Sequence, residues 1–497
     1  MGEQTPRLAL LRLSGEIGIK ARPTRMQFRK RLVQNLRDAL ASEGLPPLLE
    51  VSHDRLFAAL PAHTPLEDHA LARVFGVSSL SLVERHALVA LPDIVRMGAT
   101  LFADAVRGRH FAVRARRVGR REATTASASE VERQLGAALL PGAAGVDLEN
   151  PEVTVRLELT ERATSFFTER AQGPGGLPLG VEGRAVALFS GGFDSAVAAW
   201  QIQKRGVECD FVFCNLGGAA HLREVLRVAL HLATRWSYGA HPRLYAIDFE
   251  AIAAALRAHT MTRYWQILLK RQMLRAAEAV AEEIGASAIV TGDSVGQVSS
   301  QTLPNLAVVS RATPLALLRP LVGFDKSEIV DRARAIGTYA LSESVGEYCA
   351  LVPSKPATQA RLDAVLAEEA RLPDDPLRGA LAARTVFDLR ALEPSVFDDE
   401  GIAIDALPAD AVLLDLRPIA QYRGAHHPRA LHLDFASALT AWPSFDRAQR
   451  YVLVCEYGLL SAQLAGHMRR DGYRVHHFRG GQRALLRAAE RASGGNG

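Results

Sequence analysis

The sequence predicts a protein of several domains that combines α/β and α+β folds. Its 497 residues correspond to about three or four domains of roughly 150 residues each. Beyond residue 180, short apolar runs alternate with long amphipathic stretches, a pattern typical of a parallel, doubly wound sheet. Hydrophobic residues form 48% and charged residues 23% of the chain, which excludes wholesale disorder and coiled-coil rods.

Two smaller mixed α+β units are expected in the first 170 residues. The first, residues 1–60, starts with a strand over 7–13 and continues with a basic helix over 24–42. The second covers residues 61–170. Glycine and proline then cluster over residues 172–180, a composition that indicates a loop or linker.

The doubly wound sheet is expected in a third domain, residues 171–395. Its predicted strands cover residues 185–189, 210–214, 244–247 and 286–291, and a long helix is predicted over 267–284. A stretch over 372–407 is rich in proline, aspartate and alanine and has weak periodicity, so it is predicted to be a second linker. The last domain, residues 405–497, repeats the α/β pattern on a smaller scale, with strands over 412–416 and 451–455.

Charge is unevenly distributed although the net charge is only +5. Basic residues recur over 20–37 and over 107–121, and neither run contains an acidic residue. Such runs favour binding to a polyanion such as nucleic acid, and the alternative is an arginine-rich surface that reflects composition alone. No apolar stretch approaches the length of a membrane span and no signal-peptide pattern opens the chain, so we expect a cytoplasmic protein without membrane contact.

The four cysteines, Cys209, Cys214, Cys349 and Cys455, are too few and too scattered for a disulfide framework. None forms the C-x-x-C pair that would suggest zinc. Cys209 is expected in the core. Any cysteine with a function is therefore expected to be catalytic.

The first chemical motif is a loop that reads Ser190-Gly191-Gly192-Phe193-Asp194-Ser195 between a predicted strand and a predicted helix. Glycines let the backbone approach a phosphate, and the amides of the helix N-terminus bind its oxygens. The loop resembles the PP-loop signature of ATP pyrophosphatases, and the alternative is a tight turn without a ligand. Asp194 suits Mg²⁺ or pyrophosphate positioning, and it can cap the helix at the same time.

Further strings extend this resemblance over essentially the whole chain. They are Gly15-Glu-Ile-Gly-Ile-Lys20, Arg73-Val-Phe-Gly-Val77, Asn215-Leu-Gly-Gly-Ala-Ala-His221, Leu269-Lys-Arg-Gln-Met273, Thr291-Gly-Asp-Ser-Val-Gly-Gln-Val-Ser-Ser-Gln301, Gly323-Phe-Asp-Lys326 and Glu347-Tyr-Cys349. Together they resemble the tRNA 4-thiouridine synthetase family. The resemblance implies ferredoxin-like and THUMP domains that hold tRNA, followed by a PP-loop domain.

The resemblance also implies ATP and Mg²⁺ as cofactors and a set of nucleotide contacts. These contacts would be Leu188, Phe189, Phe213, Cys214, Lys270, Gly292 and Gln301, beside the loop residues Ser190, Gly191, Gly192 and Ser195. Such positions fit a doubly wound sheet, whose ligands lie at the carboxyl ends of the strands. Lys326 would face the phosphates, and the alternative for it is an exposed residue at a helix N-terminus.

The C-terminal domain carries a second chemistry at Cys455, where a predicted strand ends and a loop leads into a helix. Backbone amides in such a loop stabilise a thiolate or persulfide. The segment resembles the rhodanese active-site loop, with support from Leu414-Asp-Leu-Arg417, Gly424-Ala-His-His-Pro-Arg-Ala430 and Phe478-Arg-Gly-Gly481. Glu456 departs from that pattern and should raise the pKa of the thiol, so an inactive rhodanese-like domain is the alternative.

The resemblance implies an enzyme that transfers persulfide sulfur to C4 of a tRNA uridine, at position 8 in the family, through an adenylylated uridine. A cysteine desulfurase would load Cys455, Cys349 would form a transient disulfide with it, and a thiol reductant would reopen that bond. A buried structural thiol is the alternative for Cys349. Sulfur donation for the thiazole of thiamine is a second implied outlet.

One alternative from another class is an RNA-binding sulfur carrier with a vestigial ATP site. The sequence leaves the oligomeric state open, with a homodimer among the options.

Overall fold

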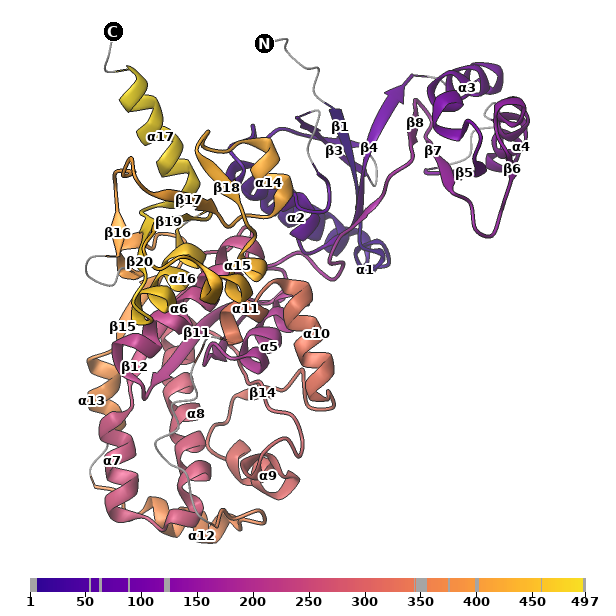
Figure 1. Ribbon diagram of the computed structural model, residues 1–497. Coiled ribbons are helices and arrows are strands. Elements are labelled where there is room, and N and C mark those ends of the chain that lie inside the picture. The colour runs from indigo at the N-terminus through magenta and orange to yellow at the C-terminus, as the bar shows by residue number, and fades with distance from the viewer. Residues whose placement is uncertain are drawn as a thin grey trace. The chain divides into compact units, whose positions relative to one another are not determined.

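The computed structural model describes residues 7–52, 55–61, 65–87, 90–119, 126–343, 345, 355–373, 376–397, 402–456 and 458–494. Within these residues, nine strands of the N-terminal part form one sheet. This sheet belongs to the first of two compact units, which comprises residues up to 183 with the segments 203–208 and 235–240. The strand order is β2-β3-β1-β4-β8-β7-β5-β6, and β9 pairs with β4 (Figure 1). The strands are β1 (Arg7–Leu13), β2 (Leu49–Ser52), β3 (Arg55–Leu60), β4 (Val77–His86), β5 (His110–Arg117), β6 (Gly145–Val146), β7 (Val153–Leu159), β8 (Thr164–Phe167) and β9 (Ala171–Gln172).

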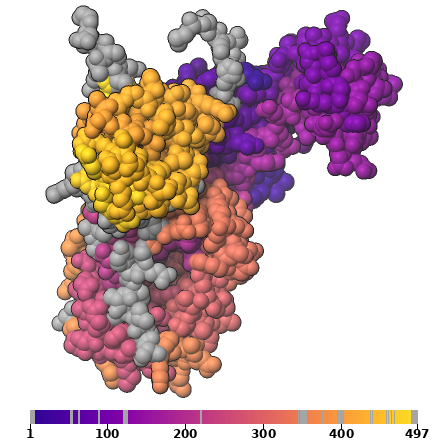
Figure 2. Space-filling view, viewed as in Figure 1, coloured from indigo at the N-terminus to yellow at the C-terminus, as the bar shows by residue number. Residues whose placement is uncertain are grey.

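Helix α2 covers one part of this sheet because its apolar residues recur every four positions. The helices of the unit are α1 (Gly15–Gly18), α2 (Arg22–Ser42), α3 (Leu91–Val106) and α4 (Ala128–Leu139), with 3-10 turns η1 (Ala70–Arg73) and η2 (Leu140–Gly142). Phe28, Leu32, Leu36 and Leu40 of α2 are buried in a core shared with β1. Helices α3 and α4 cover β5 and β7 instead, and this part of the unit forms a lobe of its own in the space-filling view (Figure 2).

A buried ion-pair cluster joins three strands of the same unit. The carboxylate of Glu158 on β7 accepts hydrogen bonds from Arg12 on β1, at 2.5 Å, and from Arg55 on β3, at 2.6 Å. Burial opposes ionisation of this carboxyl, but the two arginines outweigh burial and hold the pKa of Glu158 below its usual value. Glu158 is therefore a charged structural residue that connects the two halves of the sheet.

The second unit contains the doubly wound sheet, with strand order β14-β13-β10-β11-β12-β15. Its strands are β10 (Arg184–Leu188), β11 (Glu208–Asn215), β12 (Arg243–Asp248), β13 (Ala288–Val290), β14 (Ala316–Leu318) and β15 (Thr385–Asp388). Its helices are α5 (Phe193–Gln203), α6 (Gly218–Arg235), α7 (Glu250–His259), α8 (Trp265–Ile284), α9 (Leu303–Ser310), α10 (Lys326–Ile336), α11 (Tyr339–Glu343), α12 (Leu362–Glu369) and α13 (Pro376–Ala382), with 3-10 turns η3 (Thr262–Tyr264) and η4 (Ser299–Gln301). Strands β10, β13 and β14 pair in parallel, as do β11 and β12.

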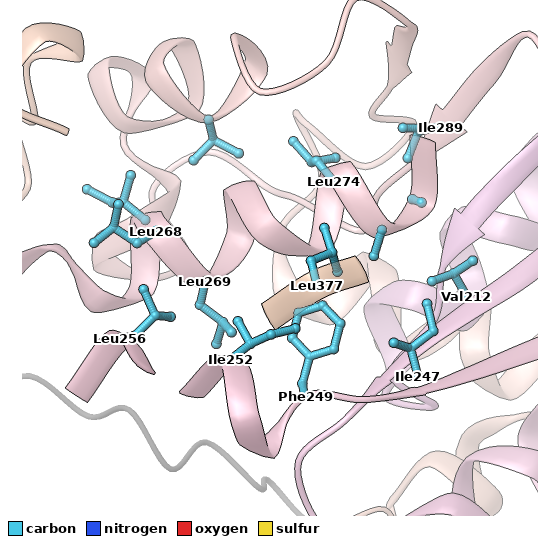
Figure 3. Close-up of a cluster of buried hydrophobic side chains, with 14 of the residues drawn as sticks. Val212, Ile247, Phe249, Ile252, Leu256, Leu268, Leu269, Leu274, Ile289 and Leu377 are labelled. Atoms are coloured by element: carbon cyan, nitrogen blue, oxygen red, sulfur yellow. The ribbon is translucent and has the colours of Figure 1, made fainter. Parts of the chain in front are cut away.

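Helix α8 is held against this sheet by an apolar core. Leu268, Leu269 and Leu274 of α8 lie in the same buried cluster as Val212 on β11 and Ile289 on β13 (Figure 3). Burying side chains of this size supplies about 1.5–3 kcal/mol each. The packing fixes the face of α8 that carries Lys270.

The predicted linker over 372–407 is wrong in part, because ordered elements lie within it. Helix α13 packs in the core of the sheet domain, and β15 pairs antiparallel with β12 as an edge strand. The sequence of β15 shows no alternation of buried and exposed side chains, because Thr385, Val386 and Asp388 are all exposed. An edge strand held mainly by backbone hydrogen bonds leaves a weak hydrophobic pattern.

The C-terminal part forms a separate parallel sheet of five strands in the order β16-β20-β19-β17-β18, among the residues described there. The strands are β16 (Ala403–Ile404), β17 (Val412–Asp415), β18 (Ala430–His432), β19 (Arg450–Val454) and β20 (Arg474–Phe478). The helices and 3-10 turns are α14 (Ile419–Gly424), α15 (Phe435–Ala441), α16 (Leu459–Arg470), α17 (Gly481–Gly494), η5 (Pro394–Phe397) and η6 (Trp442–Ser444). Apolar residues of β19 and α16 share one core, which places the end of β19 next to the start of α16.

Candidate functional site

The loop between β10 and α5 is closed by its two serines. Ser190 donates its backbone N–H to Oγ of Ser195 at 3.3 Å, and Ser195 Oγ donates to the carbonyl of Gly192 at 3.0 Å. Gly191 has a φ of 79°, and a Cβ there would lie 3.1 Å from Cα of Val225. The sequence therefore folds into a compact loop that only glycine permits at this position.

A cavity of about 240 Å³ opens beside this loop at the carboxyl ends of the strands. Its lining includes ten of the residues predicted from the sequence: Leu188, Phe189, Ser190, Asp194, Ser195, Phe213, Cys214, Lys270, Gly292 and Gln301. Gly191 and Gly192 lie in the loop itself. Residues from four separate segments thus meet around one hollow, at the place where a doubly wound sheet binds ligands.

Asp194 and Lys326 meet although they are 132 positions apart in the chain. The ammonium of Lys326 donates to both carboxylate oxygens of Asp194, at 2.9 and 3.2 Å. Lys326 is also the first residue of α10, the helix position that the sequence offered as the alternative for it. Gln297 donates its side-chain amide to Asp194 at 3.0 Å, and the sequence reasoning missed this residue although it lies in the string that ends at Gln301.

Lys270 and Gln301 meet at a residue that was also not predicted, Asp293. Lys270 Nζ lies 2.8 Å and Gln301 Nε2 lies 3.3 Å from Oδ1 of Asp293. Asp293 lies directly after Gly292, in the same string that ends at Gln301. Cys214 forms part of the cavity wall, and burial raises the pKa of its thiol, so this thiol stays protonated. Cys209 on β11 is buried, in agreement with its expected place in the core.

The second candidate site lies at the end of β19, where Cys455 is buried. The backbone N–H of Ser461, in the first turn of α16, donates to Sγ of Cys455 at 3.4 Å. The hydroxyl of Ser461 also lies 3.4 Å from Sγ. Donors at a helix N-terminus stabilise negative charge on a sulfur, which is the property that a thiolate or persulfide requires.

Glu456 does not stand alone beside this cysteine. Its carboxylate lies 3.5 Å from a guanidinium nitrogen of Arg417 and 3.4 Å from one of Arg483. Arg417 is itself fixed by Asp415 at 2.7 Å. Two arginines therefore offset the negative charge that the sequence placed next to the sulfur, and they come from segments far from the loop in sequence.

Cys349, the predicted partner of Cys455, lies outside the described residues, as do Glu347 and Tyr348 of the same string. The structure therefore gives no geometry for the predicted disulfide.

The predicted basic runs divide into surface and structural arginines. On α2, Arg22, Lys30 and Arg37 are exposed, whereas Arg31 donates to Glu208 and to two backbone carbonyls of its own unit. On β5, Arg114 and Arg116 are exposed. Arg114 and Arg117 donate to the carbonyls of Leu148 and Ala126, and Arg120 and Arg121 lie outside the described residues.

No group of three or more His, Cys, Asp or Glu side chains is arranged to hold a metal ion in the part of the chain that the structure covers. No helix within the described ranges is long and apolar enough to cross a membrane.

Fold and cavity together define a PP-loop enzyme that carries RNA-binding and rhodanese-like domains. Four family models match successive parts of the chain: a ThiI ferredoxin-like domain over residues 8–81, a THUMP domain over 90–169, the thiamine biosynthesis protein ThiI over 180–373 and a rhodanese-like domain over 403–488. The tRNA sulfurtransferase of Desulfurococcus amylolyticus is 36% identical, over 95% of this chain and 97% of its own length. That of Marinobacter nauticus is also 36% identical, over 93% of this chain and 97% of its own length. The chain belongs to the tRNA sulfurtransferase family.

A solved structure agrees with this assignment. A 4-thiouridine synthetase, crystallised in complex with RNA and with bound ATP, superimposes with a TM-score of 0.66 and 29% identity. The match covers 77% of this chain and 99% of that structure.

Proposed function

We propose that this chain makes 4-thiouridine in tRNA by transferring persulfide sulfur to C4 of a uridine, at position 8 in the family, at the expense of ATP. The observation that carries the proposal is the cavity beside the PP-loop, because Asp194, Lys270 and Gln301 line one hollow next to the phosphate-binding loop and Lys326 donates to Asp194. The 4-thiouridine synthetase that resembles this chain holds both RNA and ATP, the two substrates required here.

In the first step, the C4 oxygen of the uridine attacks the α-phosphate of ATP and pyrophosphate leaves. Negative charge builds up on the phosphates, and the ammonium groups of Lys326 and Lys270 supply the opposite charge at the cavity. The product is an adenylylated uridine, whose C4 carries AMP as a good leaving group.

Magnesium fits this site through Asp194, whose carboxylate offers the hard oxygen ligands that the ion prefers. The bound ion would neutralise phosphate charge.

In the second step, Cys455 carries a persulfide whose terminal sulfur attacks C4 and displaces AMP. The sulfur is then bound to both C4 and Sγ of Cys455. The thiolate of Cys349 attacks Sγ of Cys455, which releases 4-thiouridine and leaves a Cys349–Cys455 disulfide. A cysteine desulfurase supplies the persulfide, and a thiol reductant reopens the disulfide.

The tRNA would bind to the ferredoxin-like and THUMP domains. The exposed basic residues Arg22, Lys30, Arg37 and Arg116 offer contacts for the phosphate backbone. The arginines already bound to backbone carbonyls are less suited to this role.

A second candidate function is sulfur donation for the thiazole of thiamine. It is favoured by the match to the thiamine biosynthesis protein ThiI and by the loop at Cys455, which is built within the rhodanese-like domain. This outlet requires the persulfide but not the ATP site.

The experiment that tests the proposed reaction measures pyrophosphate release from ATP by the purified chain with and without tRNA. Release that depends on tRNA supports the proposed reaction. An RNA-binding sulfur carrier with a vestigial ATP site gives no release under either condition, and that result would refute the proposal.

A further inference from the structure

A buried carboxylate at the end of β13 organises one side of the ATP cavity. Asp293 is 7% exposed and lines that cavity. Its Oδ1 accepts hydrogen bonds from Lys270 at 2.8 Å and Gln301 at 3.3 Å, and its Oδ2 accepts from the Thr291 hydroxyl at 2.8 Å and from Arg319 at 3.2 Å. Four donors from four different elements or loops thus converge on one carboxylate.

The position of Asp293 is fixed by its surroundings. A Cβ on Gly292 would lie 2.7 Å from the carbonyl carbon of Asp194, so the segment after β13 packs directly against the start of α5. On the other side, Arg319 bonds Asp293 through Nε and donates through Nη2 to Ser310 Oγ at 3.0 Å. The carboxylate is therefore held from both sides and cannot move far without disturbing the PP-loop.

The charge of Asp293 is also fixed. Burial opposes ionisation, but Lys270, Thr291 and Arg319 outweigh burial and hold the pKa of Asp293 below its usual value. A buried negative charge repels a polyphosphate. We therefore explain the presence of Asp293 in a cavity for ATP by the ammonium and amide groups that it holds in place.

We propose that Asp293 is a positioning residue for ATP, which holds the Lys270 ammonium and the Gln301 amide in the arrangement that receives the nucleotide. Asp293 acts through these two side chains and does not itself contact ATP. This inference rests on the proposed ATP-dependent function, and it adds a residue that positions the ATP-binding side chains.

The test is direct titration of the full-length chain with Mg-ATP, without tRNA. Asp293→Asn keeps the size of the side chain and removes its charge. Because this change removes the charge-assisted hydrogen bond to Lys270, we expect Kd for ATP to rise about tenfold to a hundredfold. Thr291→Val removes one donor but leaves the charge, so it should raise Kd by a smaller factor and serves if Asp293→Asn folds poorly.

A double-mutant cycle then asks whether Asp293 acts through Lys270. In the Lys270→Gln background, Asp293→Asn should weaken ATP binding much less than it does in the wild-type chain. Equal effects of Asp293→Asn in both backgrounds would overturn the inference.

Glu369→Gln is the matched control. Glu369 is a partly buried carboxylate that also lies between two cations, Arg271 at 2.7 Å and Arg275 at 2.8 Å, but it does not line the cavity. We expect it to lower the melting temperature and leave Kd for ATP unchanged. If both variants weaken ATP binding equally, or Asp293→Asn binds as the wild type does, the role is structural and the inference is wrong. A wild-type chain that does not bind ATP overturns the proposed function itself.

Discussion

Replacing Asp194 by alanine should abolish tRNA thiolation and leave the fold intact. Its carboxylate receives two hydrogen bonds from Lys326 and one from Gln297. The side chain of Asp194 is 29% exposed and that of Lys326 is 51% exposed. A pair so open to solvent contributes about 0–1 kcal/mol to the free energy of unfolding.

The expected effect on the reaction is much larger than that on stability. Removing one group that stabilises developing charge in an active site lowers kcat about 10²- to 10³-fold, which corresponds to roughly 2.7–4 kcal/mol. The stability change of Asp194→Ala should instead shift the melting temperature by no more than about 2–4 °C. The two effects therefore differ enough to be separated.

The assay follows 4-thiouridine formation and pyrophosphate release with purified tRNA, Mg-ATP, a cysteine desulfurase and cysteine, beside a thermal melt of each variant. Asp331→Ala is the matched control, because Asp331 forms an ion pair with Arg334 at 2.9 Å on α10, the helix that begins at Lys326, but lies outside the cavity. Undiminished thiolation by Asp194→Ala would refute the assignment of the PP-loop. Equal loss in both variants would show that the loss does not depend on the position of Asp194 in the cavity.

The remaining predictions concern the other sites. Charge reversal at Arg116 should weaken tRNA binding and reduce the slope of log K against log salt by about 0.7–0.9 for each phosphate that the protein no longer neutralises, and an unchanged slope in salt-dependent binding assays would place the tRNA elsewhere. Cys455→Ser should block sulfur loading but retain pyrophosphate release, whereas Cys349→Ser should accumulate reductant-labile label from labelled cysteine and stall before product; thiolation by Cys455→Ser would exclude the rhodanese route. Glu158→Gln should destabilise the first unit by about 3–5 kcal/mol, since it leaves the buried guanidinium of Arg12 without an opposite charge, and chemical denaturation measures this loss. The pKa of Glu158 is lowered in the folded chain. Its contribution to stability should therefore be fully present above the pKa of an unfolded glutamate and be lost as pH falls through the folded-state pKa. Unfolding measured over an acid pH range that shows no such loss would contradict this prediction.

The regular elements were largely predictable because their hydrophobic patterns are strong. The strand predicted over 210–214 is β11 over Glu208–Asn215, and the helix predicted over 267–284 is α8 over Trp265–Ile284. The basic helix predicted over 24–42 begins two residues earlier, at Arg22, with proline in its first turn. Strand β15 was missed because its pairing with β12 depends on backbone hydrogen bonds that leave little trace in the sequence.

The cavity residues were predicted from motifs, whereas their mutual contacts were not. The sequence indicates Lys270 and Gln301 separately, but only the fold brings both to Asp293. At Glu456 the sequence was misleading, because the residues next to it in the chain suggest an uncompensated negative charge. Arg417 and Arg483, 39 and 27 positions away, approach it only after the rhodanese-like sheet has formed.

The most direct test of the proposed function is nucleoside mass spectrometry of tRNA from cells with and without this chain, and from cells that carry the Asp194→Ala or Cys455→Ser variant. The proposed function predicts that 4-thiouridine disappears when the chain is absent, returns with the wild-type chain and stays absent with either variant. Persistence of 4-thiouridine at the wild-type level in cells without the chain, or its full return with either variant, would contradict the account.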